Sequence, residues 1–222
     1  MGLGPADFAR ARAHMVKTQL ARRGVRDPLV LDAMSQVPRE AFVGEGYEEF
    51  AYDDLPLPIG DSQTISQPYV VALMIEAAGA GAGDIALEVG AGSGYAAAVL
   101  SRIVGRVIAI ERHSSLAEQA RRRLQRLGCD NVELHCGDGT RGWPDAAPFD
   151  VIIVSAGGPA VPDALKAQLA PDGRLVIPVG RSERHQKLLK LVRQDTAGYL
   201  TENLGDVSFV PLIGEQGWTR KP

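Results

Sequence analysis

From Asp84 onward, short apolar runs alternate with amphipathic segments, and this alternation limits the possible folds more than any other feature of the chain. The apolar runs are DIALEV, RVIAIE, NVELHC, FDVIIVS and GRLVIPVG. Alternating strand and helix patterns are typical of a parallel sheet, and near-continuous Val, Ile and Leu predicts strands that are buried on both faces. Crossover helices must then cover both sides of the sheet. Ligands of such sheets bind beyond the carboxyl ends of the strands.

The chain before this region has a different pattern, with helices and irregular loops. Apolar residues from Phe8 to Leu20 lie at mostly helical spacing, and Gly24 is placed to end that helix. Asp27 and Pro28 provide an N-cap and a first-turn proline for a second helix, LVLDAMSQV. The segment PYVVALMIEAAG predicts a third helix.

The fold class that follows is α/β. We expect a doubly wound, mostly parallel sheet of about seven strands, of the Rossmann-like type, with an N-terminal helical extension. KLLKLVRQ and YLTENLGDVSFVPL predict the last, antiparallel strands, whose order stays open. Residues 1–80 are expected to form the extension and a substrate-cleft loop, and residues 81–222 the core, as one compact unit.

Composition disfavours several classes of protein. The 222 residues carry a formal net charge of −3, which gives no overall attraction to nucleic acids or anionic membranes. The N-terminus lacks a signal-peptide core and no apolar run is long enough to span a bilayer, so we expect a cytoplasmic protein. Cys129 and Cys136 fit no metal-ligand spacing, and we expect reduced thiols and no metal. A monomer that binds neither nucleic acid nor membranes is the expected state.

The first apolar run leads into the glycine-rich segment EVGAGSGY. Gly90, Gly92 and Gly94 allow a sharp turn and close approach of a ligand to the backbone, and the helix that follows presents free N–H groups. A dinucleotide fingerprint would place a glycine or alanine three residues after Gly92, where Tyr95 stands, and this disfavours a nicotinamide-dependent oxidoreductase. Glu88, just before the turn, suits a ligand with an ammonium group better than a pyrophosphate.

Two further carboxylates end the next two strands. Glu111 can accept hydrogen bonds from the hydroxyls of a ribose, and its alternative interpretation is a solvated strand-end acid. Asp138 could accept from an adenine amino group while Gly139 shapes the pocket, and the alternative there is an Asx turn. A ligand with an ammonium, a ribose and an adenine matches S-adenosylmethionine.

The motifs together resemble a known family. EVGAGSGY, the strand-ending Glu111, CGDG, FDVIIVSAG and LAPDGRLVIPVG resemble the class I methyltransferases. With MVKTQLARRGVRDPLVLDAMSQVPREAFV before them and LPIGDSQTISQPY at the join, the chain resembles the protein-L-isoaspartate O-methyltransferase family along nearly its full length. It departs from the family at Ala91, where Thr or Ser is common, at Gln67 and Tyr69, which replace a frequent Ala and His, and at GGP, where AAP or AP is usual.

The resemblance implies a reaction. A methyl group passes from S-adenosylmethionine, leaving S-adenosylhomocysteine, to the free α-carboxylate of L-isoaspartyl residues in damaged proteins and peptides, which starts their repair through a succinimide. A carboxylate is already ionised at neutral pH, so the site needs no general base. It must remove water from the carboxylate and orient it. The resemblance assigns that orienting, catalytic role to Ser66.

The resemblance also implies the other site residues. The implied cofactor-binding residues are Gln63, Thr64, Ile65, Glu88, Gly90, Gly92, Gly94, Glu111, Arg112, Asp138 and Gly139. The implied substrate-binding residues are Ile59, Ser66, Val210 and Leu212. An alternative for Thr64 and Ser66 is that they cap the helix that begins near Pro68. Alternative functions are methylation of another carboxylate or small molecule, and a non-catalytic nucleotide-binding module, which would have no need to retain TIS. Trp143 and Trp218 are interpreted as packing residues.

Overall fold

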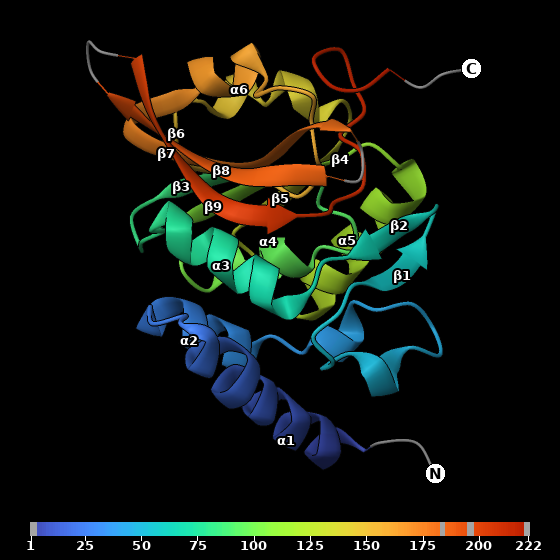
Figure 1. Ribbon diagram of the computed structural model, residues 1–222. Coiled ribbons are helices and arrows are strands. Elements are labelled where there is room, and N and C mark those ends of the chain that lie inside the picture. Colours follow the sequence, from blue (N-terminus) through green and yellow to red (C-terminus); the bar gives the residue numbers. More distant parts are fainter. Residues whose placement is uncertain (1–3, 183–184, 195–197, 220–222) are drawn as a thin grey trace.

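A seven-stranded sheet forms the centre of the molecule (Figure 1). The computed structural model describes residues 4–182, 185–194 and 198–219. The sheet has the order β5-β4-β3-β6-β7-β8-β9. Its strands are β3 (Ile85–Val89), β4 (Arg106–Glu111), β5 (Val132–Cys136), β6 (Phe149–Val154), β7 (Leu169–Ser182), β8 (His185–Gln194) and β9 (Gly198–Val207). Strands β3 to β7 pair in parallel, and β8 and β9 are antiparallel. The predicted fold class is confirmed, and the last strands are added in sequence order.

Helices cover both faces of this sheet. Figure 1 shows α3 (Pro68–Ala78), α4 (Tyr95–Ser101) and α5 (Ser114–Arg126) on one face and the short α6 (Asp163–Ala167) on the other. Alternate residues of the inner strands belong to two hydrophobic clusters, with Ala86, Val107 and Val151 in one and Leu87, Ile108 and Ile152 in the other. The strands are therefore buried on both faces, as their continuous apolar character predicts.

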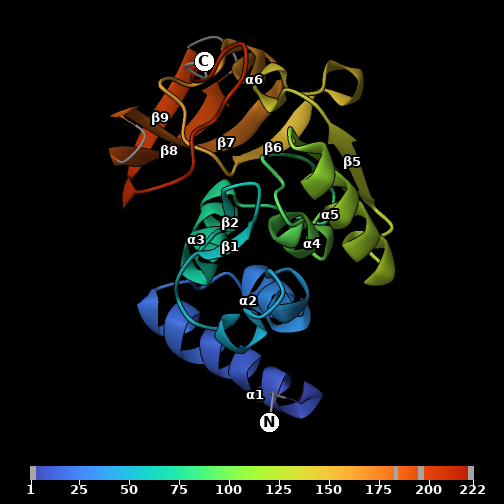
Figure 2. The same cartoon turned by 90° about the vertical axis from the view of Figure 1, so that its right-hand side faces the viewer.

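The N-terminal helices form a further layer beneath α3 and α4 (Figures 1 and 2). Helix α1 (Pro5–Met15) continues into a π-helical turn and a 3₁₀ turn, and ends at Gly24, whose φ of 108° is left-handed. Helix α2 (Pro28–Gln36) begins at Asp27, whose carboxylate accepts from the Leu29 N–H at 2.8 Å. These helices and their caps confirm the sequence prediction. Buried side chains of this layer belong to the same hydrophobic cluster as α3 and α4.

Two segments outside the large sheet lie at the carboxyl ends of its strands. Strands β1 (Leu57–Gly60) and β2 (Gln63–Ile65) form a small antiparallel hairpin beside α3 (Figure 2). The sequence predicts strand through VSFVPL, but β9 ends at Val207. The chain then crosses to the loop after β6, where the Gly157 N–H donates to the Val210 carbonyl and the Leu212 N–H donates to the Gly157 carbonyl, both at 2.8 Å. Backbone pairing with this loop replaces pairing with the sheet.

No helix in residues 4–182, 185–194 or 198–219 is long and apolar enough to cross a membrane. Over the same ranges, no cluster of three or more His, Cys, Asp or Glu side chains has a geometry that could hold a metal ion.

Candidate active site

The glycine-rich turn after β3 contains three left-handed residues with different neighbours. Gly90, Gly92 and Gly94 have φ values of 83°, 54° and 91°. Gly90 and Gly92 line a cavity at the carboxyl ends of the strands. Gly94 precedes α4, and a Cβ there would lie 3.3 Å from the Cβ of Ala120 on α5. Gly94 therefore allows the turn to pack against a helix and does not itself face the cavity.

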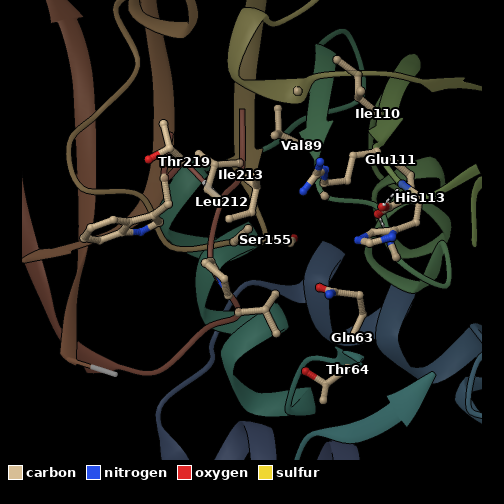
Figure 3. Close-up of a pocket in the computed structure, with 18 residues that line it drawn as sticks. Gln63, Thr64, Val89, Ile110, Glu111, His113, Ser155, Leu212, Ile213 and Thr219 are labelled. Atoms are coloured by element: carbon tan, nitrogen blue, oxygen red, sulfur yellow. Dashed lines mark hydrogen bonds between the residues drawn. The ribbon is translucent and has the colours of Figure 1, made fainter. Parts of the chain in front are cut away.

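The first cavity has a volume of about 560 Å³ and lies beyond β3, β4, β5 and β6, where the strand order changes direction. In Figure 3, Gln63 and Thr64 approach it from β2, opposite Val89 and Ile110 of the sheet. The predicted site residues that line it are Gln63, Thr64, Gly90, Gly92, Glu111, Arg112, Gly139, Val210 and Leu212. Loops of the sheet, the hairpin and the C-terminal segment thus meet at one site.

A second cavity of about 490 Å³ adjoins the first. It is formed by Ser66 and Gln67 just before α3, by His185 and Gln186 at the start of β8, and by the chain around the end of β9. Thr64, Ser155 and Val210 line both cavities. A narrow recess that leads to Glu88 is lined by Thr64, Ser66 and Ser155. Three hydroxyl groups therefore surround the junction of the cavities.

Glu88 is buried at this junction, with 1% of its surface exposed. One carboxylate oxygen accepts from the Ser155 hydroxyl at 3.4 Å, and the other, Oε2, has no partner in the part of the chain that the structure describes. Burial, and then the nearby charge of Glu111, raise the pKa of Glu88 to about 8. An unpaired buried carboxylate is unfavourable, and a cationic ligand group would relieve that cost.

Glu111 is also buried, with 4% of its surface exposed, but each of its oxygens accepts a hydrogen bond. Its two oxygens accept from the Gly92 and His113 N–H groups, each at 2.8 Å. The alternative of a solvated strand-end acid is wrong. Glu111 holds the glycine-rich turn against the end of β4 while its side chain forms part of the cavity wall.

Asp138 supports the site by holding neighbouring loops in place and does not line either cavity. Its Oδ1 accepts from the Thr140 N–H at 2.9 Å and from the Thr140 hydroxyl at 2.7 Å, which is an Asx turn. Its Oδ2 accepts from the Glu215 N–H at 2.8 Å and so fixes the C-terminal loop. Asp138 lines neither cavity, whereas Gly139 lines the first, and a Cβ at Gly139 would come within 2.5 Å of Val89 Cγ1.

Three predicted apolar contacts also differ from expectation in position. Ile59 is buried and lines neither cavity, and its Cδ1 would lie 3.1 Å from a Cβ at Gly92, so it supports the glycine-rich turn from behind. Ile65 is buried and reaches only the narrow recess. Leu212 lines the first cavity and not the second, so the structure does not place it in the same cavity as Ser66.

The capping alternative for Thr64 and Ser66 is wrong. The N-cap residue of α3 is Gln67, with no side-chain cap bond. Asp54 serves this helix end instead, because its carboxylate accepts from the Tyr69 N–H at 3.3 Å and from Gln67 Nε2 at 2.7 Å. Neither the Thr64 nor the Ser66 hydroxyl is hydrogen-bonded within the ranges that the structure covers.

The same contacts give a physical account of two departures from the family pattern. Gln67 donates to Asp54, and the Tyr69 ring lies 3.7 Å from the guanidinium carbon of Arg23. Arg23 also forms an ion pair with Asp54. The two residues therefore join the N-terminal extension to the start of α3, and the cluster ends beside Ser66.

Sequence reasoning missed several lining residues. Ser155 follows the strand FDVIIVS at the same sheet edge as the strand-end carboxylates, so a signal for it was present. His113 and Trp218 carried no such signal. The sequence favours a packing role for Trp218, yet this residue lines the first cavity and its Nε1 donates to the Gly157 carbonyl at 2.9 Å. Trp143 does pack, stacked on His135 with ring centroids 3.7 Å apart.

Comparisons with known proteins agree with this geometry. The family model described as protein-L-isoaspartate(D-aspartate) O-methyltransferase matches residues 10–217. Protein-L-isoaspartate O-methyltransferase 1 of Rhodopseudomonas palustris (strain HaA2) is 57% identical over 211 residues, which cover 95% of this chain and 86% of that protein. The protein-L-isoaspartate O-methyltransferase of Methylorubrum extorquens (strain PA1) is 59% identical over 207 residues, covering 93% of this chain and 90% of that protein.

Solved structures give the same result. A protein-L-isoaspartate O-methyltransferase superposes with a TM-score of 0.85 at 33% identity, covering 93% of this chain and 67% of that chain. A putative protein-L-isoaspartate O-methyltransferase from Plasmodium falciparum, in complex with S-adenosyl-L-homocysteine, superposes with a TM-score of 0.77 at 27% identity, covering 91% of this chain and 98% of that chain. This chain belongs to the protein-L-isoaspartate(D-aspartate) O-methyltransferase family.

Proposed function

We propose that this chain transfers a methyl group from S-adenosylmethionine to the free α-carboxylate of L-isoaspartyl residues in damaged proteins and peptides. This step starts their repair through a succinimide. Its membership of the family, at 57% identity to a named enzyme, supports the activity. The observation that carries the assignment of the site is the junction of two cavities at Thr64, Ser155 and Val210. Methyl transfer requires a donor site and an acceptor site that open onto each other.

The residues of the first cavity, together with Glu88 in the adjoining recess, fit the cofactor. The unpaired Oε2 of Glu88 suits an ammonium group, and Glu111 lies on the wall where a ribose can donate to it. Gln63 and Thr64 on the hairpin cover the opposite side. The volume of about 560 Å³ is in the usual range for small-molecule sites. When bound, S-adenosylmethionine supplies an electrophilic methyl group on a sulfonium centre. We assign Asp138 a supporting role behind Gly139, where it holds Thr140 and the Glu215 backbone in place.

The second cavity is the proposed site of the isoaspartyl residue. The Ser66 hydroxyl is free to donate to the substrate carboxylate and to hold one of its oxygens toward the junction. Val210 lines both cavities and is the remaining candidate for backbone contact with the peptide. The carboxylate is ionised at neutral pH, so these residues bind, orient and exclude water without removing a proton.

A methyl-transfer assay with labelled S-adenosylmethionine tests the function. Matched peptides that differ only in an isoaspartyl or an aspartyl residue should give labelled ester from the isoaspartyl peptide alone. Transfer to a small carboxylate with none to the peptide would favour the alternative methyltransferase. Calorimetric binding of S-adenosylhomocysteine without transfer to any acceptor would favour a nucleotide-binding module. Binding of NAD with no response to S-adenosylhomocysteine would contradict the cofactor assignment.

We further propose that the chain acts as a cytoplasmic monomer on isoaspartyl proteins and peptides, without nucleic-acid or membrane partners. The formal net charge of −3 supports the last point. Light scattering coupled to size-exclusion chromatography should give a mass close to 23.7 kDa, and twice that mass would contradict the monomer.

A further inference from the structure

The segment Ser208–Leu212, which we call the dividing segment, separates the two cavities. Ser208, Phe209 and Val210 line the second cavity, and Val210, Pro211 and Leu212 line the first. The segment lies outside the sheet, because β9 ends at Val207. Its position therefore depends on contacts other than a continuous strand ladder.

Gln186 on β8 supplies one of these contacts. Its side chain has 2% of its surface exposed. Nε2 donates to the Phe209 carbonyl at 3.1 Å, and Oε1 accepts from the Phe209 N–H at 2.8 Å. A neighbouring antiparallel strand would satisfy the same two backbone groups in the same way. The side-chain amide thus extends the strand pairing to Phe209, two residues beyond the end of β9 at Val207.

The loop after β6 holds the segment from its other side. The Gly157 N–H donates to the Val210 carbonyl, and the Leu212 N–H donates to the Gly157 carbonyl, both at 2.8 Å. A Cβ at Gly157 would lie 2.3 Å from Gln186 Nε2, so the Gln186 amide fills the space beside this glycine. The dividing segment is therefore fixed between one side-chain amide and one loop backbone.

We propose that Gln186 is a positioning residue for both ligands. Gln186 fixes Phe209 and thereby the position of the dividing segment. Because this segment forms a wall of each cavity, its position couples the shape of the peptide site to that of the cofactor site. This inference rests on the proposed function of the two cavities. Gln186 lines the second cavity itself and does not line the first, so its proposed effect on the cofactor site is transmitted by the backbone of Ser208–Leu212, and it performs no chemistry.

The chain offers a matched control in Gln168. Its Nε2 donates to the Arg141 carbonyl at 2.8 Å, and its Oε1 accepts from the Trp143 N–H at 2.7 Å. A Cβ at Gly142 would lie 2.3 Å from that Oε1. Gln168 therefore makes the same buried two-bond contact beside a glycine, but neither Arg141 nor Trp143 lines either cavity.

The test compares Gln186→Met with Gln168→Met. Methionine keeps the length of glutamine but forms neither amide hydrogen bond, so both variants should lower the melting temperature by several degrees. Only Gln186→Met should also raise the KM for an isoaspartyl peptide and the calorimetric Kd for S-adenosylhomocysteine, each by about tenfold. A raised KM with an unchanged Kd would show only a direct effect of Gln186 on the second cavity, which it lines, and would overturn the proposal. Both constants unchanged, or equal changes in the two variants, would also overturn it.

Hydrogen exchange of the Phe209 amide in the unmodified protein gives a readout that needs neither catalysis nor a folded variant. The amide should be protected without ligand and more protected with S-adenosylhomocysteine. Free exchange in both states would overturn the proposal even if Gln186→Met does not fold. If the unmodified protein shows no methyl transfer, the proposed function fails, while the calorimetric and exchange results still decide the role of Gln186.

Discussion

Glu88 and Glu111 end neighbouring strands, yet their carboxylates have different surroundings. Glu111 accepts from two backbone N–H groups, whereas Glu88 has an oxygen without a partner among the described residues and lies near the charge of Glu111. The strand patterns place both residues at the sheet edge. They carry no information on this difference, because burial and hydrogen bonding depend on the path of the glycine-rich turn and on Ser155 from a distant strand.

Glu88→Gln should make the stability of the ligand-free protein less dependent on pH. Folding raises the pKa of Glu88 from 4.5 to about 8. Its stabilising contribution is therefore complete below pH 4.5 and is lost as the pH rises through 8. Glutamine stays neutral, so the variant should match the native protein at acidic pH. At alkaline pH, above the pKa of the buried carboxyl group, it should exceed the native free energy of unfolding by a few kcal/mol. Urea denaturation across this range is the measurement. A gain of equal size at every pH would contradict the titration of Glu88.

Ser66→Ala should separate substrate orientation from cofactor binding. The hydroxyl forms no hydrogen bond in the described residues and caps no helix, so the melting temperature should stay nearly unchanged. Losing a hydrogen bond to a charged carboxylate costs about 1.5–3 kcal/mol, which predicts a single-turnover rate lower by roughly 10- to 150-fold. The Kd for S-adenosylhomocysteine should change by less than about twofold. Ser66→Thr keeps the hydroxyl but crowds the site, and should retain part of the rate. A normal rate in Ser66→Ala would remove Ser66 from the reaction.

At the scale of elements, the start of α3 shows how helix ends position the site. The sequence predicts this helix and its bounds correctly, because Pro68 and Gly79 are local signals. The group that satisfies its first turn is Asp54, which lies on the other side of the hairpin in sequence. A cap that comes from a separate loop leaves no pattern next to the helix in the sequence. Local pattern therefore favours the nearby Thr64 and Ser66 as the capping residues. The free hydroxyls next to the helix are a consequence of that distant cap.

Asp54→Ala should destabilise the protein through the start of α3. The variant loses an acceptor for Gln67 and Tyr69 and an ion-pair partner of Arg23, and we expect a loss of about 1–2 kcal/mol in the free energy of unfolding. Asp53→Ala is the matched control, because Asp53 is exposed and the contacts with Gln67, Tyr69 and Arg23 are made by Asp54. Chemical denaturation of both variants provides the comparison. Equal stability losses would show that the effect does not arise from the helix end.

At the scale of the whole molecule, Tyr95 joins the glycine-rich turn to the N-terminal extension. It stands where a dinucleotide fingerprint has a small residue, and its side chain is buried among extension residues. Its hydroxyl donates to Met34 Sδ at 3.5 Å, its ring centroid lies 5.6 Å from that of Phe42, and the guanidinium of Arg39 lies 5.0 Å away. The alternation of strands and helices predicts the sheet. It does not predict this contact, because Tyr95 meets residues that are far away in sequence.

Phe42→Ala tests whether the extension and the sheet unfold together. Phe42 is fully buried, and removing its ring should cost about 3–5 kcal/mol. Both tryptophans, Trp143 and Trp218, lie in the sheet part of the chain, so their fluorescence reports on that part alone. If the two parts share one core, urea transitions followed by fluorescence and by far-ultraviolet circular dichroism should coincide and shift by the same amount. Phe50→Ala makes the same chemical change at a side chain that is 48% exposed, and should shift neither transition by more than about 0.5 kcal/mol. A fluorescence transition that stays in place in Phe42→Ala while circular dichroism shows an earlier step would mean that the extension unfolds as a separate unit.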